Sequence, residues 1–314
     1  MSKILVTGAF GQIGIELTPA LQKKHGLNNV IALGHKNIPD DFEGQVERAD
    51  INDVDKLKTL IEKYEISEIY HLVSLLSVGG EANPDLCWEV NMGGLKKILD
   101  FARDHELKVF WPSSIAAFGP TTPKNAPQST ILEPTTMYGV TKVSGELLCQ
   151  YYFLKYGVDV RSVRYPGIVS WKTPPSNGTS EYSVAMFYEG LKSGKYECFL
   201  SEETRIPMMY VDDAVKATIG IMDADISQIK VRTSYNVSAL SFSAKELENE
   251  AKKHFKLDVT YKPDERQKIA DSWPNSMDDS QARSDWGWKP DFELSKLVED
   301  MIKNLKAHPD LIKN

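Results

Sequence analysis

A short apolar run followed at once by closely spaced glycines opens the chain and limits its fold more than any other feature. Residues 4–7 have the pattern of a strand buried on both faces, and residues 15–21 have the apolar spacing of a helix. Gly8, Gly11 and Gly14 lie between them. Such glycines let the backbone turn tightly, approach a pyrophosphate and point the N–H groups of the helix start at it. The sequence therefore predicts a dinucleotide-binding unit, with a ligand-free turn as the alternative.

The same alternation of strands and helices continues to about residue 170. Further strands are predicted at 29–33, 46–51, 68–73, 107–111 and 158–164, and helices at 53–64, at 84–106 and from about Tyr138. Residues 74–81 and 119–134 have the composition of loops. Strands that alternate with helices indicate an α/β fold with a Rossmann-type, doubly wound parallel sheet.

Beyond residue 170 the alternation gives way to scattered helices and short strands. A turn-rich loop spans 174–180, a helix at 211–222 is expected to rejoin the first domain, and two or three helices and a loop at 270–274 follow residue 242. We therefore predict a dinucleotide-binding domain from 1–170, rejoined by about 206–236. Residues 171–205 and 237–314 would form a smaller C-terminal substrate-binding lobe.

Composition and charge restrict the partners and the location. The chain has 314 residues, a formal net charge of -7 and no dense run of Lys and Arg, so nucleic acid is not an expected partner. No apolar run approaches the roughly 18 residues of a membrane span, and the first strand leaves no room for a targeting peptide. Cys87, Cys149 and Cys198 are far apart, which suggests reduced thiols. We expect a cytoplasmic protein without a membrane partner.

Tyr138 and Lys142 are the candidate acid–base pair. Four residues apart on a helix, they would share one face. A free phenol titrates near ~10, and a nearby ammonium would lower that pKa and make Tyr138 a usable base. Tyr151 and Tyr188 are also followed by a lysine four residues later, so only the surrounding residues can distinguish Tyr138 and Lys142 from these other pairs.

Polar residues in or beside other elements are further candidates. The strand at 107–111 is followed by Pro112, Ser113 and Ser114. The Ser114 hydroxyl could hold a substrate oxygen there or simply cap the strand. Asn91, with two glycines after it, lies inside the helix at 84–106, where close packing or a hydrogen-bonding role would explain it. His71 is expected to be a packed residue rather than a ligand.

The end of the second strand bears on the choice of cofactor. An acidic residue there would bind the adenosine ribose of NAD, but this chain has Gly34, His35 and Lys36. A nearby Lys or His could accept the 2′-phosphate of NADP, whereas both side chains could equally be solvated. NAD is the expected cofactor, and NADP is the alternative.

The glycine loop, the strand-end serines and the Tyr138/Lys142 pair resemble those of the extended short-chain dehydrogenase/reductases. A narrower similarity to the L-threonine 3-dehydrogenases of that superfamily runs through 75–77, 112–120, 160–167, 207–210 and 269–274. The last two segments, Pro-Met-Met-Tyr and Ile-Ala-Asp-Ser-Trp-Pro, are absent from sugar-nucleotide epimerases of similar length. Two departures stand out: the family usually has Asp in place of Gly34, and its loop Gly-Gly-Gly-Thr-Thr-Asp-Tyr is Ser-Asn-Gly-Thr-Ser-Glu-Tyr at 176–182.

The resemblance implies oxidation of L-threonine at Cβ to 2-amino-3-oxobutyrate by a homodimer, with hydride transfer to NAD. Ser114 would orient the substrate hydroxyl, Tyr138 would be the general base, and Lys142 would lower the pKa of Tyr138 and bind the nicotinamide ribose. The implied cofactor contacts are Gly8, Gly11, Gln12, Ile13, Gly34, His35, Lys36, Asp50, Ile51, Leu72, Asn91, Tyr138, Lys142, Tyr165, Pro166 and Ile168. The implied substrate contacts are Ser77, Ser114, Tyr138, Thr179, Ser180 and Trp273.

Three alternatives are weighed against this function. Zinc could polarise the hydroxyl, but the scattered cysteines and histidines offer no ligand set, so no metal is expected. A sugar-nucleotide epimerase or dehydratase would share the Tyr/Lys pair and retain its dinucleotide through the cycle. A non-catalytic dinucleotide sensor would lack Tyr138 or Lys142, and both are present.

Overall fold

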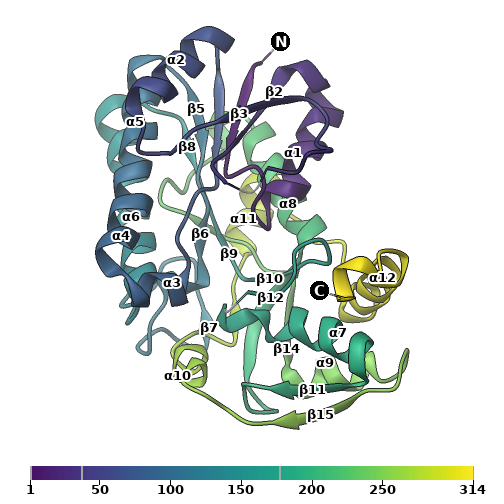
Figure 1. Cartoon of the computed structure of the whole chain (residues 1–314). Helices are drawn as coiled ribbons and strands as arrows, with labels where there is room; N and C mark the ends of the chain where they lie inside the picture. Colours follow the sequence, from purple (N-terminus) through teal and green to yellow (C-terminus); the bar gives the residue numbers. More distant parts are fainter. Residues whose placement is uncertain (1, 37, 177, 314) are drawn as a thin grey trace.

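A sheet of six parallel strands forms the centre of the N-terminal part of the computed structural model, which describes residues 2–36, 38–176 and 178–313 (Figure 1). The strand order is β3-β2-β1-β4-β5-β8. These strands are β1 (Ile4–Thr7), β2 (Val30–Gly34), β3 (Gln45–Arg48), β4 (Glu68–His71), β5 (Lys108–Phe110) and β8 (Val160–Arg161). The chain leaves β1 in one direction for β2 and β3 and in the other for β4 and β5, so the predicted doubly wound α/β fold is confirmed.

Helices cover both faces of this sheet, and alternate side chains of β1 pack against each layer. Ile4 and Val6 belong to a core with α1 (Gly14–His25) and α8 (Val211–Asp223), whereas Leu5 belongs to a core with the helices of the other face. Those helices are α2 (Val54–Tyr64), α5 (Gly94–Asp104) and α6 (Met137–Tyr156). The period of two along a strand explains this division, and α8 packs in the same core as Ile4 and Val6.

The helix predicted at 84–106 contains a π-turn. It consists of α4 (Pro84–Trp88), the π-turn (Glu89–Gly93) and α5. Within the turn, the Asn91 side chain accepts from the backbone N of Leu75 at 2.7 Å and donates to its carbonyl at 3.0 Å. A Cβ on Gly94 would lie 3.1 Å from Ile51. Asn91 therefore fixes the chain after β4, and Gly94 permits close packing.

Two sequence-based boundaries were wrong. Residues 74–81 are not entirely loop, because α3 (Ser77–Ala82) begins at Ser77 despite the glycines at 79 and 80. The strand predicted at 158–164 divides at Ser162 into β8 and β9 (Val163–Tyr165). Strand β9 leaves the main sheet and pairs with β6 (Ser113–Ser114) and β13 (Tyr235–Asn236), which directs the chain toward the second half of the molecule.

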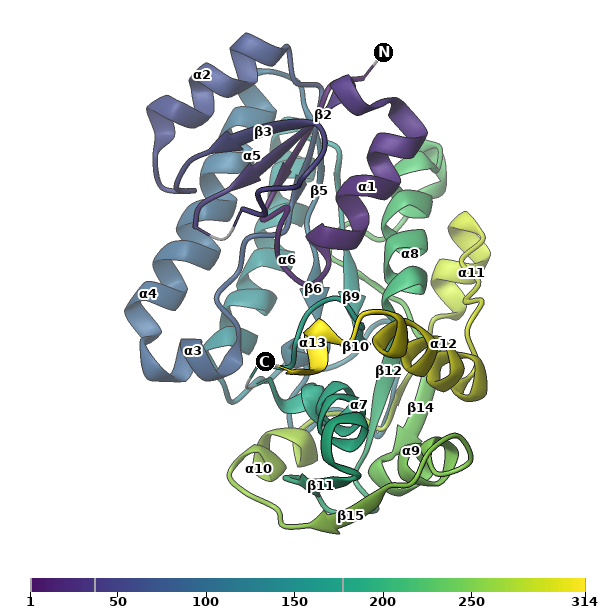
Figure 2. The same ribbon diagram turned by 45° about the vertical axis from the view of Figure 1, so that its right-hand side comes forward.

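Most of the remaining elements form a lobe next to the carboxyl ends of the main strands, whereas α11 lies beside α8 (Figure 2). Its sheets pair β10 (Gly167–Val169), β12 (Arg205–Tyr210) and β14 (Leu240–Ser243), and β11 (Lys195–Cys198) with β15 (Asp258–Tyr261). A short ribbon pairs β7 (Asn125–Ala126) with β16 (Ser276–Met277). Helix α7 (Tyr182–Ser193) follows a 3₁₀ turn (Thr179–Glu181). In the described chain the tail holds more than the two or three helices expected: α9 (Ala244–Ala251), α10 (Arg266–Asp271), α11 (Ser280–Trp286), α12 (Leu294–Ala307) and α13 (Asp310–Lys313).

The short tail helices escaped prediction because four to eight residues show little periodicity. Ala282 and Trp288 join the core formed by α1, α8 and the sheet, although both lie in the range 237–314 assigned to the lobe. The domain boundaries as a whole stay a prediction. Among the described residues, no helix has both the length and the apolar character that crossing a bilayer requires.

Candidate active site

The glycine loop after β1 has the geometry that a pyrophosphate requires. Gly8 has a φ of +73°, and a Cβ on it would lie 3.0 Å from the backbone N of Val73. A Cβ on Gly14 would overlap the carbonyl of Gly8 and lie 2.7 Å from the backbone of Ala9. Gly11 is exposed, and the nearest atom to its Cβ position is 3.5 Å away. The first and third glycines therefore shape the turn, and the second leaves the approach to the backbone open.

Two adjoining cavities follow the carboxyl edge of the sheet from this loop. The larger, of about 600 Å³, is lined by eight of the predicted cofactor contacts: Gly8, Gly11, Gly34, His35, Lys36, Asp50, Ile51 and Leu72. The smaller, of about 150 Å³, is lined by Gln12, Ile13, Tyr138, Lys142, Tyr165, Pro166 and Ile168 and by all six predicted substrate contacts. Leu72 and Ser74 line both cavities, so the two adjoin each other along the carboxyl edge of the sheet. Asn91 lines neither one in the described structure, because its amide is used to hold Leu75.

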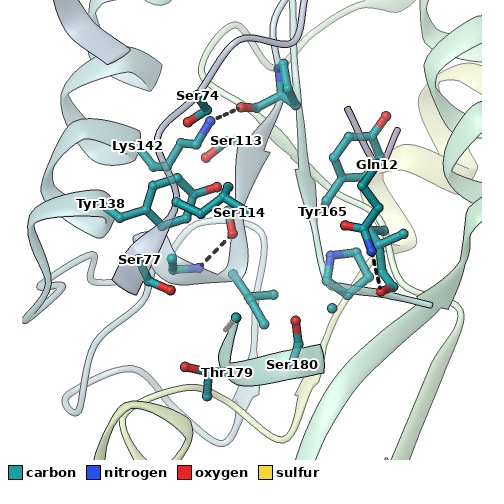
Figure 3. Close-up of a pocket in the computed structure, with 18 of the residues that line it drawn as sticks. Gln12, Ser74, Ser77, Ser113, Ser114, Tyr138, Lys142, Tyr165, Thr179 and Ser180 are labelled. Carbon is teal, nitrogen blue, oxygen red and sulfur yellow. Dashed lines mark hydrogen bonds between the residues drawn. The ribbon is translucent and has the colours of Figure 1, made fainter. Parts of the chain in front are cut away.

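Ser114, Tyr138 and Lys142 meet at the smaller cavity (Figure 3). Ser114 ends β6, and its Oγ accepts from the backbone N of Ala116 at 3.2 Å. Tyr138 and Lys142 lie in the first turns of α6, which Thr136 caps by accepting from the backbone N of Gly139. The Lys142 Nζ donates to the carbonyl of Pro112 at 2.7 Å and lies 5.3 Å from the centre of the Tyr138 ring. The structure therefore brings the predicted catalytic residues together.

The Tyr138 phenol has a raised pKa in the structure, whereas the sequence predicts a lowered one. Burial raises the pKa of Tyr138 to about 12, although the nearby hydroxyls of Ser114 and Ser74 act in the opposite direction. Burial also lowers the pKa of Lys142 to about 7, against the opposing charges of Cys149 and Glu146. Burial is the largest influence on the pKa of Tyr138 in this structure, and the expectation that Lys142 lowers this pKa stays a prediction. The Lys142 amine is bonded to Pro112, and the loss of solvent around the phenol dominates.

The substrate end of the smaller cavity carries a buried hydroxyl without a partner. Thr179 is 1% exposed, and its Oγ1 makes no hydrogen bond to the described part of the protein. Buried polar atoms are nearly always bonded, so an unbonded one that lines a cavity indicates a ligand contact. Ser77 and Trp273 are also buried there, and Ser180 faces the same space. Asn177, within the predicted substrate loop, lies outside the described residues.

A buried ion pair beside the catalytic residues was not predicted. Glu146, one turn after Lys142 on α6, accepts from Arg164 Nε at 2.8 Å and Nη2 at 2.7 Å. It also accepts from the hydroxyl of Ser113 at 2.5 Å. Together with the bond from Lys142 to Pro112, these contacts tie α6 to the strand that carries Ser114. Ser74 was also missed as a site residue, although its place in the loop after β4, which ends at His71, could have indicated it.

Within residues 2–36, 38–176 and 178–313, no group of three or more histidine, cysteine or acidic side chains is placed to hold a metal ion. The absence of a metal from the reaction stays a prediction.

Comparisons with known proteins identify the family. Residues 4–238 match the model of the NAD dependent epimerase/dehydratase family, and the chain belongs to that family. It is 45% identical over 305 residues to the mitochondrial L-threonine 3-dehydrogenase of Bos taurus, covering 96% of this chain and 82% of that protein. It is 43% identical over 313 residues to an uncharacterized epimerase/dehydratase of Staphylococcus haemolyticus, covering 98% of each.

Solved structures give the same result in three dimensions. A monomeric L-threonine 3-dehydrogenase from a metagenome superposes with a TM-score of 0.95 at 49% identity, over 97% of this chain and 99% of that one. L-threonine dehydrogenase from Phytophthora infestans superposes with a TM-score of 0.95 at 45% identity, over 98% and 100%. The predicted resemblance to L-threonine 3-dehydrogenases is confirmed, and with it the prediction of an NAD-dependent oxidoreductase.

Proposed function

We propose that this protein oxidises L-threonine at Cβ to 2-amino-3-oxobutyrate with NAD. The observation that carries the proposal is the meeting of Ser114, Tyr138 and Lys142 at a small cavity that adjoins a dinucleotide groove. The relatives named as L-threonine 3-dehydrogenases support the choice of substrate. The test is the release of NADH with L-threonine, since an epimerase or dehydratase of this family would retain its dinucleotide.

The residues around the cavity suit the removal of a proton from an alcohol. Ser114 donates to the substrate's Cβ hydroxyl and orients it, and Tyr138 as phenolate accepts the hydroxyl proton. The Ser114 hydroxyl and the Tyr138 phenol line the same small cavity, so a substrate hydroxyl bound there would transfer its proton directly. The glycine loop would hold the pyrophosphate, and Gln12, Tyr165 and Pro166 would line the nicotinamide end. Oxidised nicotinamide, when bound, supplies the hydride acceptor and a positive charge.

Lys142 serves both the phenol and the ribose in this proposal. Its pKa of about 7 means that the ammonium form predominates below neutral pH and is lost as the pH rises through that value. The amine keeps two donor hydrogens beyond the one used by Pro112, which leaves it free to bond a ribose hydroxyl and the Tyr138 oxygen.

The size of the cavity favours a small substrate over a sugar nucleotide. About 150 Å³ adjoin the catalytic residues, against about 600 Å³ in the part assigned to the adenosine half of the cofactor. An epimerase or dehydratase needs room for a second nucleotide beside the first. A compact amino acid is the better match.

The Thr179→Val variant tests the substrate end of the cavity. Valine has nearly the same shape as threonine and lacks the unbonded hydroxyl, so the fold loses no hydrogen bond. We expect KM for L-threonine to rise roughly 2- to 10-fold with little change in kcat. The matched control is Thr18→Val, because the Thr18 hydroxyl is also buried without a partner among the described residues but lines neither cavity. An unchanged KM in Thr179→Val would remove this residue from the binding site.

We also propose that the protein forms a homodimer through α4 and α6. These helices are neighbours (Figure 1). They expose large apolar side chains: Leu86 and Trp88 on α4, and Val140, Leu147, Tyr151 and Leu154 on α6. Leu154 is 72% exposed. A contiguous apolar surface of this kind is typical of an interface, and a two-fold axis would pair each patch with its copy. The related structure described as monomeric is the competing outcome.

Replacing Leu154 by Glu is expected to dissociate this dimer, because a charge within an apolar interface must be desolvated. Light scattering coupled to size exclusion would show the mass fall from two chains to one. Ile226→Glu is the control, since Ile226 is 49% exposed on a turn after α8 and lies outside the patch. A wild-type protein that runs as one chain at micromolar concentration would contradict the proposal.

A cytoplasmic location is part of the same proposal. Cys87, Cys149 and Cys198 are buried free thiols, as expected in a reducing compartment. Fractionation of cells that express the chain would test it, and recovery with an extracellular or membrane fraction would contradict it.

A further inference from the structure

The end of β2 has no room for the carboxylate that usually binds the adenosine ribose of NAD. A Cβ on Gly34 would lie 2.6 and 2.7 Å from two carbons of the Phe10 ring and 2.8 Å from a side-chain carbon of Ile38. The ring of Phe42 packs edge-on against Phe10, with 5.0 Å between ring centres. Phe10 is thus held over Gly34, and the glycine is a requirement of the packing.

Cationic side chains gather at the same edge. His35 and Lys36 are exposed and line the larger cavity. Arg48, the β3 partner of Gly34, donates from Nη1 to the carbonyl of His35 at 2.9 Å and of Lys36 at 3.4 Å, so its guanidinium lies under this turn. The opposing charge is Asp50, whose carboxylate is 3.7 Å from His35 Nε2. Among the residues that the structure describes, the Lys36 ammonium has no ion-pair partner.

At the end of β2 this protein has cationic side chains in place of the carboxylate that would repel a phosphate on the ribose. In NAD-binding folds the carboxylate at the end of β2 bonds the ribose 2′-hydroxyl and repels a phosphate there, whereas a nearby cation accommodates one. We propose that Lys36 and Arg48, at the edge formed by residues 34–36, bind a 2′-phosphate, so that this protein accepts NADP as well as NAD. The inference deepens the proposed function, because it concerns the same groove, but it does not depend on the identity of the alcohol.

Binding of two nucleotide fragments tests this site without any turnover. Calorimetric titration of the full chain would compare 2′,5′-ADP with 5′-AMP, which differ only in the 2′-phosphate. We expect 2′,5′-ADP to bind about 10- to 100-fold more tightly, the range for bonds to a charged group. Lys36→Glu is expected to remove this preference, measured as the ratio of the affinities for 2′,5′-ADP and 5′-AMP. Lys58→Glu is the matched control, because Lys58 is exposed on α2 and lines neither cavity.

The outcomes separate this inference from the proposed function. Equal binding of the two fragments by the wild-type protein would overturn it, as would a preference that survives both Lys36→Glu and Arg48→Met. A preference for 2′,5′-ADP that Lys36→Glu removes would establish the site, even if L-threonine proved not to be the substrate. Failure of L-threonine turnover would instead overturn the proposed function alone.

Discussion

Tyr138→Phe is expected to lower kcat by about 10²–10⁴, the contribution of a positioned general base. The change removes one oxygen and keeps the ring, which packs against the lobe's apolar core. Fold and dinucleotide binding should therefore be preserved, as circular dichroism and calorimetry would show. The initial rate of absorbance increase at 340 nm with L-threonine and NAD measures the loss.

A matched control uses the repeated spacing of tyrosine and lysine. Tyr151→Phe changes a tyrosine that also precedes a lysine by four residues but is half exposed on α6 and lies outside the cavity. Its rate should equal that of the wild type. Near-normal turnover in Tyr138→Phe would show that another group is the base.

Arg164→Met is expected to destabilise the protein by about 3–5 kcal/mol, because it leaves a buried carboxylate without its partner. Glu146 is 1% exposed, and Arg164 gives it two hydrogen bonds. Urea denaturation measures the change in the free energy of unfolding. Arg103→Met is the control: Arg103 is paired with Asp104 at the surface, and such pairs contribute about 0–1 kcal/mol. A loss no greater than that of the control would contradict this role for the pair.

The double variant Glu146→Leu/Arg164→Met separates stability from positioning. Replacing both charges by apolar groups removes the unpaired charge, so stability should largely return. The contact that ties Ser113 to α6 stays absent, and Ser114 is the next residue. We expect kcat to remain reduced with KM for the dinucleotide nearly unchanged. Full recovery of kcat would mean that the pair only stabilises the fold.

The parts of the fold that sequence predicted well depend on local signals. The β-branched run of β1, the glycines after it and the capped start of α6 are each determined by neighbouring residues. The start of α3 was missed because two glycines disfavour a helix locally. In the fold, however, a Cβ on Gly80 would lie 3.0 Å from Cys87 Sγ. The division at Ser162 has no local signal at all, since residues on both sides suit a strand and only their partners differ.

The candidate site shows the same limit. The motif around Tyr138 located the residues, but the pKa of the phenol depends on burial and on where the Lys142 amine points, and neither is local. Glu and Arg are residue types that are usually found at the surface. Glu146 on α6 and Arg164 on β9 are buried as a pair because of the tertiary packing, which the sequence does not show locally. Gly34 was recognised as a departure from the family, while the position of Phe10 over it is a tertiary fact.

The most direct test of the central claim is the absorbance at 340 nm when the purified protein is mixed with L-threonine and NAD. A sustained rise beyond one equivalent of protein is the expected result, because it shows that reduced cofactor is released at each turnover. No rise with either NAD or NADP, from a protein that binds the dinucleotide by calorimetry, would contradict the assignment of L-threonine. Sugar nucleotides would then be the next substrates to test.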